Sequence, residues 1–319
     1  MAQAPRGRRK LTMRVCVAGA GAIGGWVAAR LALAGNAVTA LTSSGPIDRI
    51  TLEEDGETAV AELGKFDGPP DLLIVAVKAP ALPGLAPRLA DMIAPETLIV
   101  PMLNGVPWWF VAGEPLRSVD PDGGIAAALP IGQVVGCVVH ASCSRPAPGR
   151  VAVKHADRLI IGEPDSASSV RLARLQALLA EAGLKPDPTS NIRRATWYKL
   201  WGNATINPLS ALTRATADAI LADAECRGWM LEGMAELAAV GAAIGCPITE
   251  SGEDRMAVTA RLGAFKTSML QDVEAGRPIE LEALVGAPRE IAWRHGISTP
   301  ALDRLYGVTR LMAERLGLG

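Results

Sequence analysis

The sequence predicts an α/β domain followed by an all-helical domain. Strand-like and helix-like segments alternate in the first half of the chain, which is the pattern of a parallel sheet covered by helices. From residue 191 onward the periodicity is almost entirely helical. A chain of 319 residues also suits two cores better than one. We therefore expect a disordered basic tail at residues 1–12, an α/β domain at 13–188 and a helical domain at 189–319.

The elements of the first domain follow from short apolar runs bounded by turn residues. Continuous apolar runs such as 71–77 indicate strands that are buried on both faces. We expect strands at 14–18, 37–41, 71–77, 97–102, 134–142 and 158–161, and helices at 23–33 and 166–181. The segment 185–190 contains two prolines and a serine, which indicate a linker.

The second half contains five predicted helices, at 191–207, 222–244, 251–275, 279–295 and 300–316. Gly245 and Gly276 are typical residues for ending a helix. Pro208 lacks the N–H that a regular helix needs, so the first of these helices should bend or stop at Asn207.

Composition excludes several classes of function. A formal net charge of −1 gives no reason to expect a nucleic-acid partner. No apolar stretch is long enough to cross a bilayer, and residues 1–12 lack the apolar run of a signal peptide, so we expect a soluble, cytoplasmic protein. The five cysteines are scattered, without a CxxC pair or a histidine at ligand spacing, so we expect reduced thiols and no metal site.

A glycine-rich motif, GAGAIG at residues 19–24, directly follows the first predicted strand and opens the first predicted helix. In such a βα unit Gly19 permits the tight turn, Gly21 lets the backbone approach a pyrophosphate, and Gly24 lets the helix pack on the strand. Ala22 and Ile23 would offer backbone N–H groups at the positive end of the helix. The placement predicts a Rossmann-type dinucleotide site; the alternative is a purely structural turn.

The end of the second strand normally states the cofactor preference. An acidic residue there binds the ribose hydroxyls of NAD, and an arginine accommodates the 2′-phosphate of NADP. Here the stretch contains Ser43 with neither an acid nor an immediate arginine, although Arg49 is near in sequence. The choice between the two cofactors stays open.

A polar stripe runs along the helix predicted at 191–207. Lys199, Asn203 and Asn207 are four residues apart, so successive members rotate by only about 40° on a helix. One ammonium and two carboxamides on one face suit the capture of a small polyoxygenated substrate. The alternative is a solvated helix face.

With these motifs the chain resembles the ketopantoate reductase (2-dehydropantoate 2-reductase) family, from about residue 13 to about residue 310. The family's helix motif W-x-K-L-x-x-N-x-x-x-N-P-L is matched in full at residues 197–209. The other matches are the glycines of the GxGxxG motif, Lys78 in VAVKA, Asn104-Gly105, the segment SMLQD at 268–272 and the segment ELE at 280–282. The resemblance implies a Rossmann-type domain and a C-terminal domain like that of 6-phosphogluconate dehydrogenase.

The resemblance also implies roles for two ionisable residues. Lys199 would be the general acid that protonates the alkoxide forming at C2 as hydride arrives, which suits a positioned ammonium. Glu280 would accept a substrate hydroxyl and tune the lysine. Because Glu280 follows Pro278, we expect it in the first turn of a helix, where the dipole favours a carboxylate.

Five further residues receive roles from the same resemblance. Asn203, Asn207 and Ser268 would bind substrate oxygens, Asn104 would lie near the nicotinamide and Lys199, and Lys78 would lie beside the cofactor cleft. Each has an ordinary alternative as a strand-end or helix-surface residue.

The chain departs from the family pattern at two places. Ser43 stands where the family usually has an arginine for the 2′-phosphate. After Asn104-Gly105 comes an aromatic run, Trp108, Trp109 and Phe110, where the family usually has small or polar residues. These rings either line a pocket for a substrate bulkier than ketopantoate or cover the core.

The leading hypothesis is therefore an oxidoreductase that reduces a 2-oxo acid, ketopantoate to pantoate, with NADP(H) favoured by the family and NAD(H) possible. A second hypothesis is an NAD-dependent D-2-hydroxyacid dehydrogenase of the mandelate type, which Ser43 and the aromatic run favour. A third, from another class, is a nucleotide-sensing protein without catalysis. The only expected partners are the small-molecule substrate and, as a family-level expectation, a second copy in a homodimer.

Overall fold

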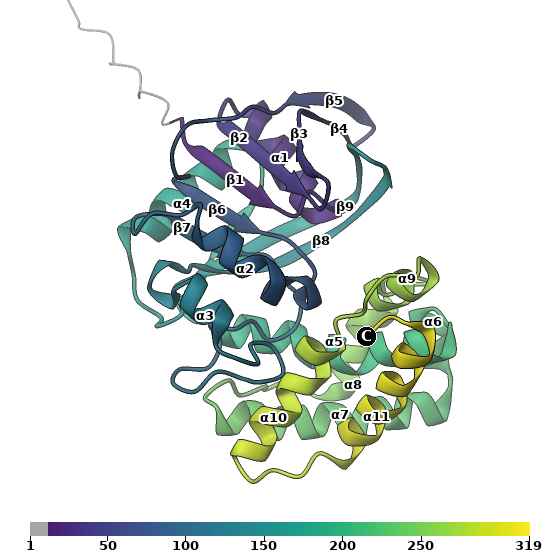
Figure 1. Ribbon diagram of the computed structural model, residues 1–319. Coiled ribbons are helices and arrows are strands. Elements are labelled where there is room, and N and C mark those ends of the chain that lie inside the picture. The colour runs from purple at the N-terminus through teal and green to yellow at the C-terminus, as the bar shows by residue number, and fades with distance from the viewer. Residues whose placement is uncertain (1–11) are drawn as a thin grey trace, which may run out of the picture.

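The computed structural model describes residues 12–319, so the predicted tail at 1–12 lies outside the described residues except for Thr12. Figure 1 shows an α/β lobe that carries the N-terminal part of the chain and a helical lobe that begins with the helix Ile192–Thr213. The predicted order of an α/β part and a helical part is confirmed. The exact division at residues 188 and 189 stays a prediction.

The first sheet has the order β3-β2-β1-β6-β7 and contains four of the predicted strands together with β3, which was not predicted. The bounds are β1 Arg14–Ala18, β2 Ala37–Thr42, β3 Gly45–Ile47, β6 Leu72–Val75 and β7 Leu98–Pro101. All residues of β6 and β7 are buried, as their apolar sequences predict. β2, β1, β6 and β7 run parallel, so their carboxyl ends share one edge, and only β3 is antiparallel.

A second sheet has the order β10-β9-β4-β5, with β8 on β9. The bounds are β4 Arg49–Glu54, β5 Glu57–Glu62, β8 Gly136–Ala147, β9 Arg150–Gly162 and β10 Pro186–Pro188. The β4–β5 hairpin was not expected, because its alternating charged residues lack a clear apolar run. β8 and β9 are also longer than predicted.

The prediction of a linker at 185–190 was wrong, because the middle of this segment forms the edge strand β10. The N–H of Leu159 donates to the Lys185 carbonyl at 3.0 Å, and the N–H of Thr189 donates to the Ile161 carbonyl at 2.8 Å. Proline is tolerated in an edge strand because its missing N–H faces away from the ladder.

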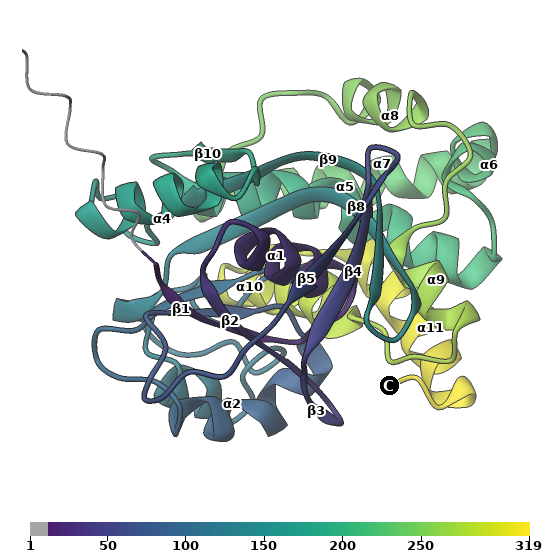
Figure 2. The same cartoon turned by 90° about the horizontal axis from the view of Figure 1, so that it is seen from above.

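Four helices belong to the α/β lobe: α1 Ala22–Leu33, α2 Leu82–Ala90, α3 Gly124–Ala128 and α4 Val170–Glu181. Figure 2 shows α1 between the two sheets, and α1 contacts strands of both. α2 was not predicted, because Pro83 and Pro87 obscure a helical pattern. It buries Leu82, Ala86 and Leu89, spaced for one helix face.

The helical lobe consists of α5 Ile192–Thr213, α6 Ala217–Ala222, α7 Ala224–Ala243, α8 Gly252–Ala260, α9 Ser268–Glu274, α10 Ala287–Arg294 and α11 Pro300–Leu316. A π-helical turn, Glu282–Gly286, precedes α10. The predicted range of α11 is confirmed without change.

Two predicted helices of this lobe are corrected by the structure. The first was expected to bend or stop at Asn207, and it does not stop there: α5 continues through Pro208 to Thr213, because Leu209, Ser210 and Ala211 are buried and their packing outweighs one lost hydrogen bond. The predicted helix 251–275 is two helices. Gly263 has a φ of +67° and breaks the run, and the Thr267 side chain caps α9 by accepting from the N–H of Leu270.

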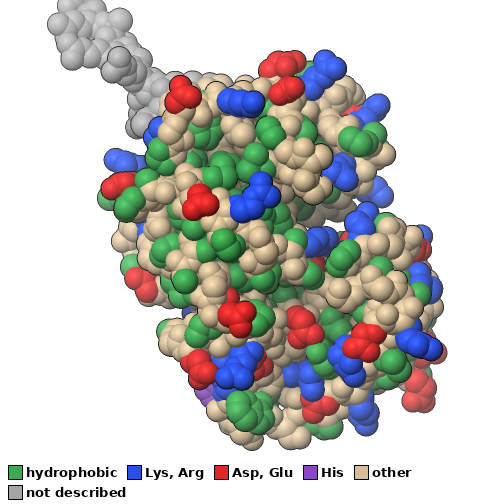
Figure 3. All heavy atoms as spheres, viewed as in Figure 1, with side chains coloured by type: hydrophobic (Ala, Val, Ile, Leu, Met, Phe, Trp, Pro, Cys, Tyr) green, Lys and Arg blue, Asp and Glu red, His purple; other side chains and the backbone are tan. Residues whose placement is uncertain are grey.

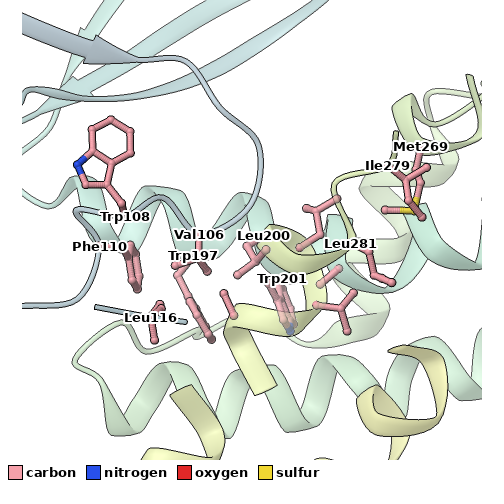
Figure 4. Close-up of a cluster of buried hydrophobic side chains, with 14 of the residues drawn as sticks. Val106, Trp108, Phe110, Leu116, Trp197, Leu200, Trp201, Met269, Ile279 and Leu281 are labelled. Carbon is pink, nitrogen blue, oxygen red and sulfur yellow. The ribbon is translucent and has the colours of Figure 1, made fainter. Parts of the chain in front are cut away.

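The two lobes share one hydrophobic core. Figure 4 shows Phe110 of the α/β lobe beside Trp197 of α5, and their rings stack with centroids 5.9 Å apart. Trp108, Trp109 and Phe110 are all buried in this core. The loop after β7 is therefore packed firmly against α5, which fixes the lobes relative to each other.

Within residues 12–319, no helix combines the length and the apolar character that crossing a bilayer requires. Figure 3 shows side chains of both charge signs scattered over one face of the molecule. The same face is hollowed between the lobes, and Lys or Arg side chains lie at this hollow.

Candidate active site

Two glycines of the GxGxxG loop are required by packing. Gly19 has a φ of +98°, and a Cβ there would lie 2.7 Å from the Ala76 carbonyl group. A Cβ at Gly24 would lie 2.1 Å from the Gly19 oxygen. Any side chain at either position would push the loop away from the carboxyl end of β6.

Gly21 differs, because its surroundings are open. Among the described residues, no heavy atom would lie within 4 Å of a Cβ added there. Gly21 is also the N-cap of α1, and no side chain of the described part of the chain caps it. The N–H groups of Ala22 and Ile23 stand at this uncapped, positive end of the helix. The loop is thus a cradle that fits an anionic group such as a pyrophosphate.

Lys199 extends from α5 toward the α/β lobe. Its Nζ donates to Asn104 Oδ1 at 3.0 Å and to the Val139 carbonyl of β8 at 2.8 Å. Burial lowers the pKa of Lys199 below its ordinary value of 10.5, and the charge of Glu280 partly opposes this shift. The amine is therefore held in place by neutral acceptors and releases its proton more readily than a surface lysine does.

Glu280 is 4% exposed and forms the centre of the site. Its Oε1 accepts from the N–H of Ala79 at 3.2 Å, and its Oε2 accepts from Asn104 Nδ2 at 3.2 Å. Lys78 Nζ lies 3.3 Å from the same Oε2. The Asn104 amide therefore connects Glu280 to Lys199, one through each of its polar atoms.

The expected helical position of Glu280 was wrong by one residue. Glu280 precedes the helical turn that begins at Leu281, and its carbonyl accepts from the N–H of Leu284 at 3.1 Å. Its carboxylate bonds to groups of the α/β lobe and not to its own helix. Charge and hydrogen bonds from Lys78, Ala79 and Asn104 therefore replace the helix dipole that sequence reasoning invoked.

Lys78 follows β6 and reaches the helical lobe. Its Nζ lies 2.6 Å from Asp272 Oδ2 and 3.3 Å from Glu280 Oε2. Burial acts to lower the pKa of Lys78, but Glu280 and Asp272 outweigh it, so the pKa lies above the ordinary value. The lysine thus stays charged and bridges the two lobes.

Sequence reasoning gave no role to Asp272, although this residue is 2% exposed and binds Lys78 directly. One signal was available: Asp272 lies four residues after Ser268, on the same face of a helix. His140 of β8 is a second titratable residue near the site to which no role was given. Burial, followed by the charge of Lys199, lowers the pKa of His140 to about 4.

The remaining predicted substrate residues lie at different depths. Asn203 lines one pocket together with Lys199 and Asn104. Asn207, one turn further along α5, is 4% exposed. Ser268 is exposed and starts α9, a helix that packs against α5. The polar stripe of α5 thus begins at Lys199 and Asn203 in the pocket and passes into the core at Asn207.

The aromatic run divides between core and pocket. Trp108 Nε1 donates to the Leu129 carbonyl at 3.1 Å, and Phe110 stacks on Trp197, so both rings belong to the core. Trp109 lines the pocket that contains Lys199 and Asn203. Its buried Nε1 has no hydrogen-bond partner among the residues that the structure describes.

Ser43 lies exposed just beyond β2, as its sequence position predicts. The neighbouring hydroxyls of Thr42 and Ser44 are 2.9 Å apart, and Thr42 also donates to the Gly45 carbonyl at 2.8 Å. Arg49, at the start of β4, is exposed as well. This turn presents hydroxyl groups and carries no carboxylate between residues 42 and 45.

Comparisons with known proteins agree with this arrangement. Residues 15–166 match the family model described as ketopantoate reductase PanE/ApbA, and residues 191–313 match the model of its C-terminal domain. The chain is 35% identical to a 2-dehydropantoate 2-reductase of Mesorhizobium japonicum, and the match covers 96% of this chain and 99% of that protein.

Solved structures give the same assignment. A crystal structure from Ralstonia solanacearum MolK2, provisionally assigned as a ketopantoate reductase, is 46% identical with a TM-score of 0.90, covering 97% of this chain and 100% of that one. A D-mandelate dehydrogenase solved with NADH and anilino(oxo)acetate shares the fold at 19% identity and a TM-score of 0.80, covering 96% and 100%. The chain belongs to the ketopantoate reductase family, a family of nicotinamide-dinucleotide-dependent oxidoreductases.

Proposed function

We propose that this protein reduces the 2-oxo acid ketopantoate to pantoate, with NADP(H) as its cofactor. The observation that carries the proposal is the ammonium of Lys199, held by Asn104 where the glycine-loop lobe meets the helical lobe. A relative that matches nearly the whole chain is named 2-dehydropantoate 2-reductase, and this supports ketopantoate as the substrate.

Lys199 is the proposed general acid. When bound, the reduced nicotinamide supplies a hydride to the carbonyl carbon of the substrate. Within residues 12–319, two of the three N–H bonds of Lys199 are used by Asn104 and the Val139 carbonyl, which leaves one to donate to the substrate oxygen. A lowered pKa favours the transfer of that proton to the oxygen as negative charge develops.

Glu280 is the proposed partner of Lys199 and of the substrate. Its carboxylate fixes Asn104, which in turn orients the lysine, and its negative charge favours the protonated amine. In the proposal the same carboxylate accepts the hydroxyl of the substrate. Asn203, Asn207 and Ser268 would bind the remaining substrate oxygens.

The glycine loop is the proposed holder of the cofactor. Gly19, Gly21 and Gly24 would let the pyrophosphate approach, and Ala22 and Ile23 would donate N–H groups to it. The open space at Gly21 supports this assignment. Lys78 and Asn104 would lie beside the nicotinamide half.

Ser43 is proposed to lie beside the 2′-phosphate of NADPH. The turn after β2 offers hydroxyls and no carboxylate that would repel this phosphate. NAD(H) is the alternative, since an arginine at this position is missing. We further propose that the enzyme works in the cytoplasm and forms a homodimer.

An aryl 2-oxo acid is the competing substrate, and one observation favours it. Trp109 is one of the residues that line the pocket containing Lys199. The burial of Trp108 and Phe110 in the core weakens this alternative, because only one ring of the three reaches the pocket.

A cofactor-oxidation assay tests the proposal. NADPH and NADH are each offered with ketopantoate and with phenylglyoxylate, and the loss of nicotinamide absorbance is followed. The proposal expects the highest kcat/KM for ketopantoate with NADPH. Faster turnover of phenylglyoxylate with NADH would replace it with the D-2-hydroxyacid dehydrogenase. Cofactor binding without turnover of either acid would indicate a nucleotide-sensing protein.

A further inference from the structure

We propose that Asp272 is a positioning residue: it holds Lys78 on the helical lobe, and so keeps the charge of Glu280 available to Asn104 and Lys199. The inference rests on the proposed function for its catalytic consequence, but the arrangement itself is a property of the folded chain. Asp272 is then a second carboxylate of the site beside Glu280, and it acts without touching substrate or cofactor.

The geometry of the shared lysine carries the inference. Lys78 Nζ is closer to Asp272 Oδ2, at 2.6 Å, than to Glu280 Oε2, at 3.3 Å. Both carboxylates are buried, with side chains 3% and 4% exposed, whereas that of Lys78 is 40% exposed. The charge of Lys78 is therefore shared between two buried carboxylates, and Asp272 has the shorter contact with it.

Asp272 is itself fixed from the other side. Its Oδ1 accepts from Arg277 Nε at 3.0 Å, and the Asp272 carbonyl accepts from the N–H of Arg277 at 2.9 Å. It also lies within α9, which packs against the α5 helix that carries Lys199. Asp272 thus binds the Lys78 ammonium from a helix of the opposite lobe.

The effect on Lys199 follows from the sharing of charge. If Asp272 lost its charge, Lys78 would pair with Glu280 alone and move closer to it. Glu280 would then be better neutralised and would stabilise the Lys199 ammonium less, so the pKa of Lys199 would fall further below 10.5. Loss of Lys78 would have the opposite effect.

Other groups near Lys199 do not replace this pathway. Among residues 12–319, the titratable groups that interact with its charge are Glu280 and, on β8, Cys137 and His140; the carboxylate is that of Glu280. Burial raises the pKa of Cys137 to about 12, and that of His140 lies at about 4, so both are neutral near pH 7. Glu280 is therefore the charge through which Asp272 and Lys78 reach Lys199.

The test measures the Lys199 proton directly. The chain has seven lysines, so their side-chain nitrogens can be labelled with ¹⁵N and assigned by single Lys→Arg variants. The pH titration of the Lys199 nitrogen is then followed by NMR in the whole protein without substrate or cofactor. Asp272→Asn should lower the titration midpoint by roughly 0.5 to 1 pH unit.

Glu274→Gln is the matched control. It removes a carboxylate of the same helix, α9, and breaks an ion pair with Lys266 at 2.7 Å that lies on the surface. It should leave the Lys199 midpoint unchanged. Lys78→Met should raise the midpoint, and adding Asp272→Asn to Lys78→Met should then produce no further change.

Two results would overturn the inference. One is an unchanged Lys199 midpoint in folded Asp272→Asn protein; the other is an equal fall of the midpoint in the Lys78→Met background. If Asp272→Asn does not fold, Lys78→Met decides alone, since a lowered midpoint there contradicts the account. Failure of the proposed function is a separate result: absent turnover by the wild-type protein leaves these titrations intact. In an active enzyme, the alkaline limb of kcat/KM, which reports the free protein, should shift with the NMR midpoint.

Discussion

Lys199 Nζ lies 3.0 Å from Asn104 Oδ1, while Nδ2 of the same amide lies 3.2 Å from Glu280 Oε2. The lysine and the glutamate both belong to the helical lobe, and the asparagine follows β7 of the α/β lobe. The site is therefore complete only where the two lobes pack together. A shared core, in which Phe110 stacks on Trp197, holds them in this position.

Replacing Asn104 should break the hydrogen-bonded connection between Lys199 and Glu280. Asn104→Ala removes the bridge, so the Lys199 side chain loses one of its acceptors and its fixed direction. We expect kcat to fall about 100-fold, the scale on which small misplacements act in active sites. Asn104→Asp should also slow turnover but move the alkaline limb of kcat to higher pH, because a new carboxylate favours protonated Lys199. A shift to lower pH in Asn104→Asp would contradict this reading. Steady-state rates from pH 6 to 10 provide the measurement.

The glycine loop offers a pair of variants with opposite consequences. Gly21→Ala places a methyl group in open space, so the melting temperature should hardly change, while the methyl group obstructs the approach of a pyrophosphate. Gly24→Ala places one 2.1 Å from the Gly19 oxygen, so stability should fall by roughly 1–3 kcal/mol. Thermal melts and cofactor titrations distinguish the two. Unweakened cofactor binding by Gly21→Ala would show that the pyrophosphate lies elsewhere.

Most of the first sheet was predictable because its strands are buried on both faces. The sequence at 72–75 and 98–101 is continuously apolar, and the structure buries all of it. The second sheet was harder to predict, since β4 and β5 form a hairpin with charged residues at their exposed positions. β10 carries two prolines and looks like a linker in sequence, because pairing with β9 is a long-range contact.

The site was partly predictable, because its residues stand in short sequence motifs. Spacing and resemblance selected Lys78, Asn104, Lys199 and Glu280, and the structure brings these four into one hydrogen-bonded group. No local pattern indicated that Lys78 would bind Asp272, a residue 194 positions away. Tertiary packing determines which residue Lys78 binds. Tertiary packing also explains why α5 continues past Pro208, which the local sequence does not predict.

Cofactor preference should respond to the residue at position 43. Ser43→Asp would place a carboxylate beside the proposed 2′-phosphate, and repulsion should lower kcat/KM for NADPH at least 10-fold relative to NADH. Ser43→Arg should change the ratio in the opposite direction. Rates with both cofactors at fixed substrate measure the ratio. An identical ratio in all three proteins would place the 2′ position of the cofactor away from this turn.

The pH dependence of turnover follows from the environment of Lys199. A general acid must carry its proton, so the rate should fall as pH rises through the pKa of Lys199. Burial lowers that pKa, so the midpoint of the alkaline limb should lie below 10.5. Lys199→Arg should stay charged but inactive across the same range, since a guanidinium does not release its proton. Normal activity of Lys199→Arg would mean that charge alone, without proton donation, is sufficient.

The central claim is that Lys199, an amine of the helical lobe, protonates the oxygen of a substrate that is reduced by a cofactor held at the glycine loop. It is tested most directly by comparing Lys199→Ala with the surface variant Lys266→Ala, using calorimetric cofactor binding and single-turnover oxidation of NADPH by ketopantoate. The account predicts that Lys199→Ala binds cofactor within about threefold of wild type and loses 100- to 10,000-fold in rate, the range typical of a general acid. Lys266→Ala should match wild type in both. A Lys199→Ala variant that keeps most of its single-turnover rate would contradict the account.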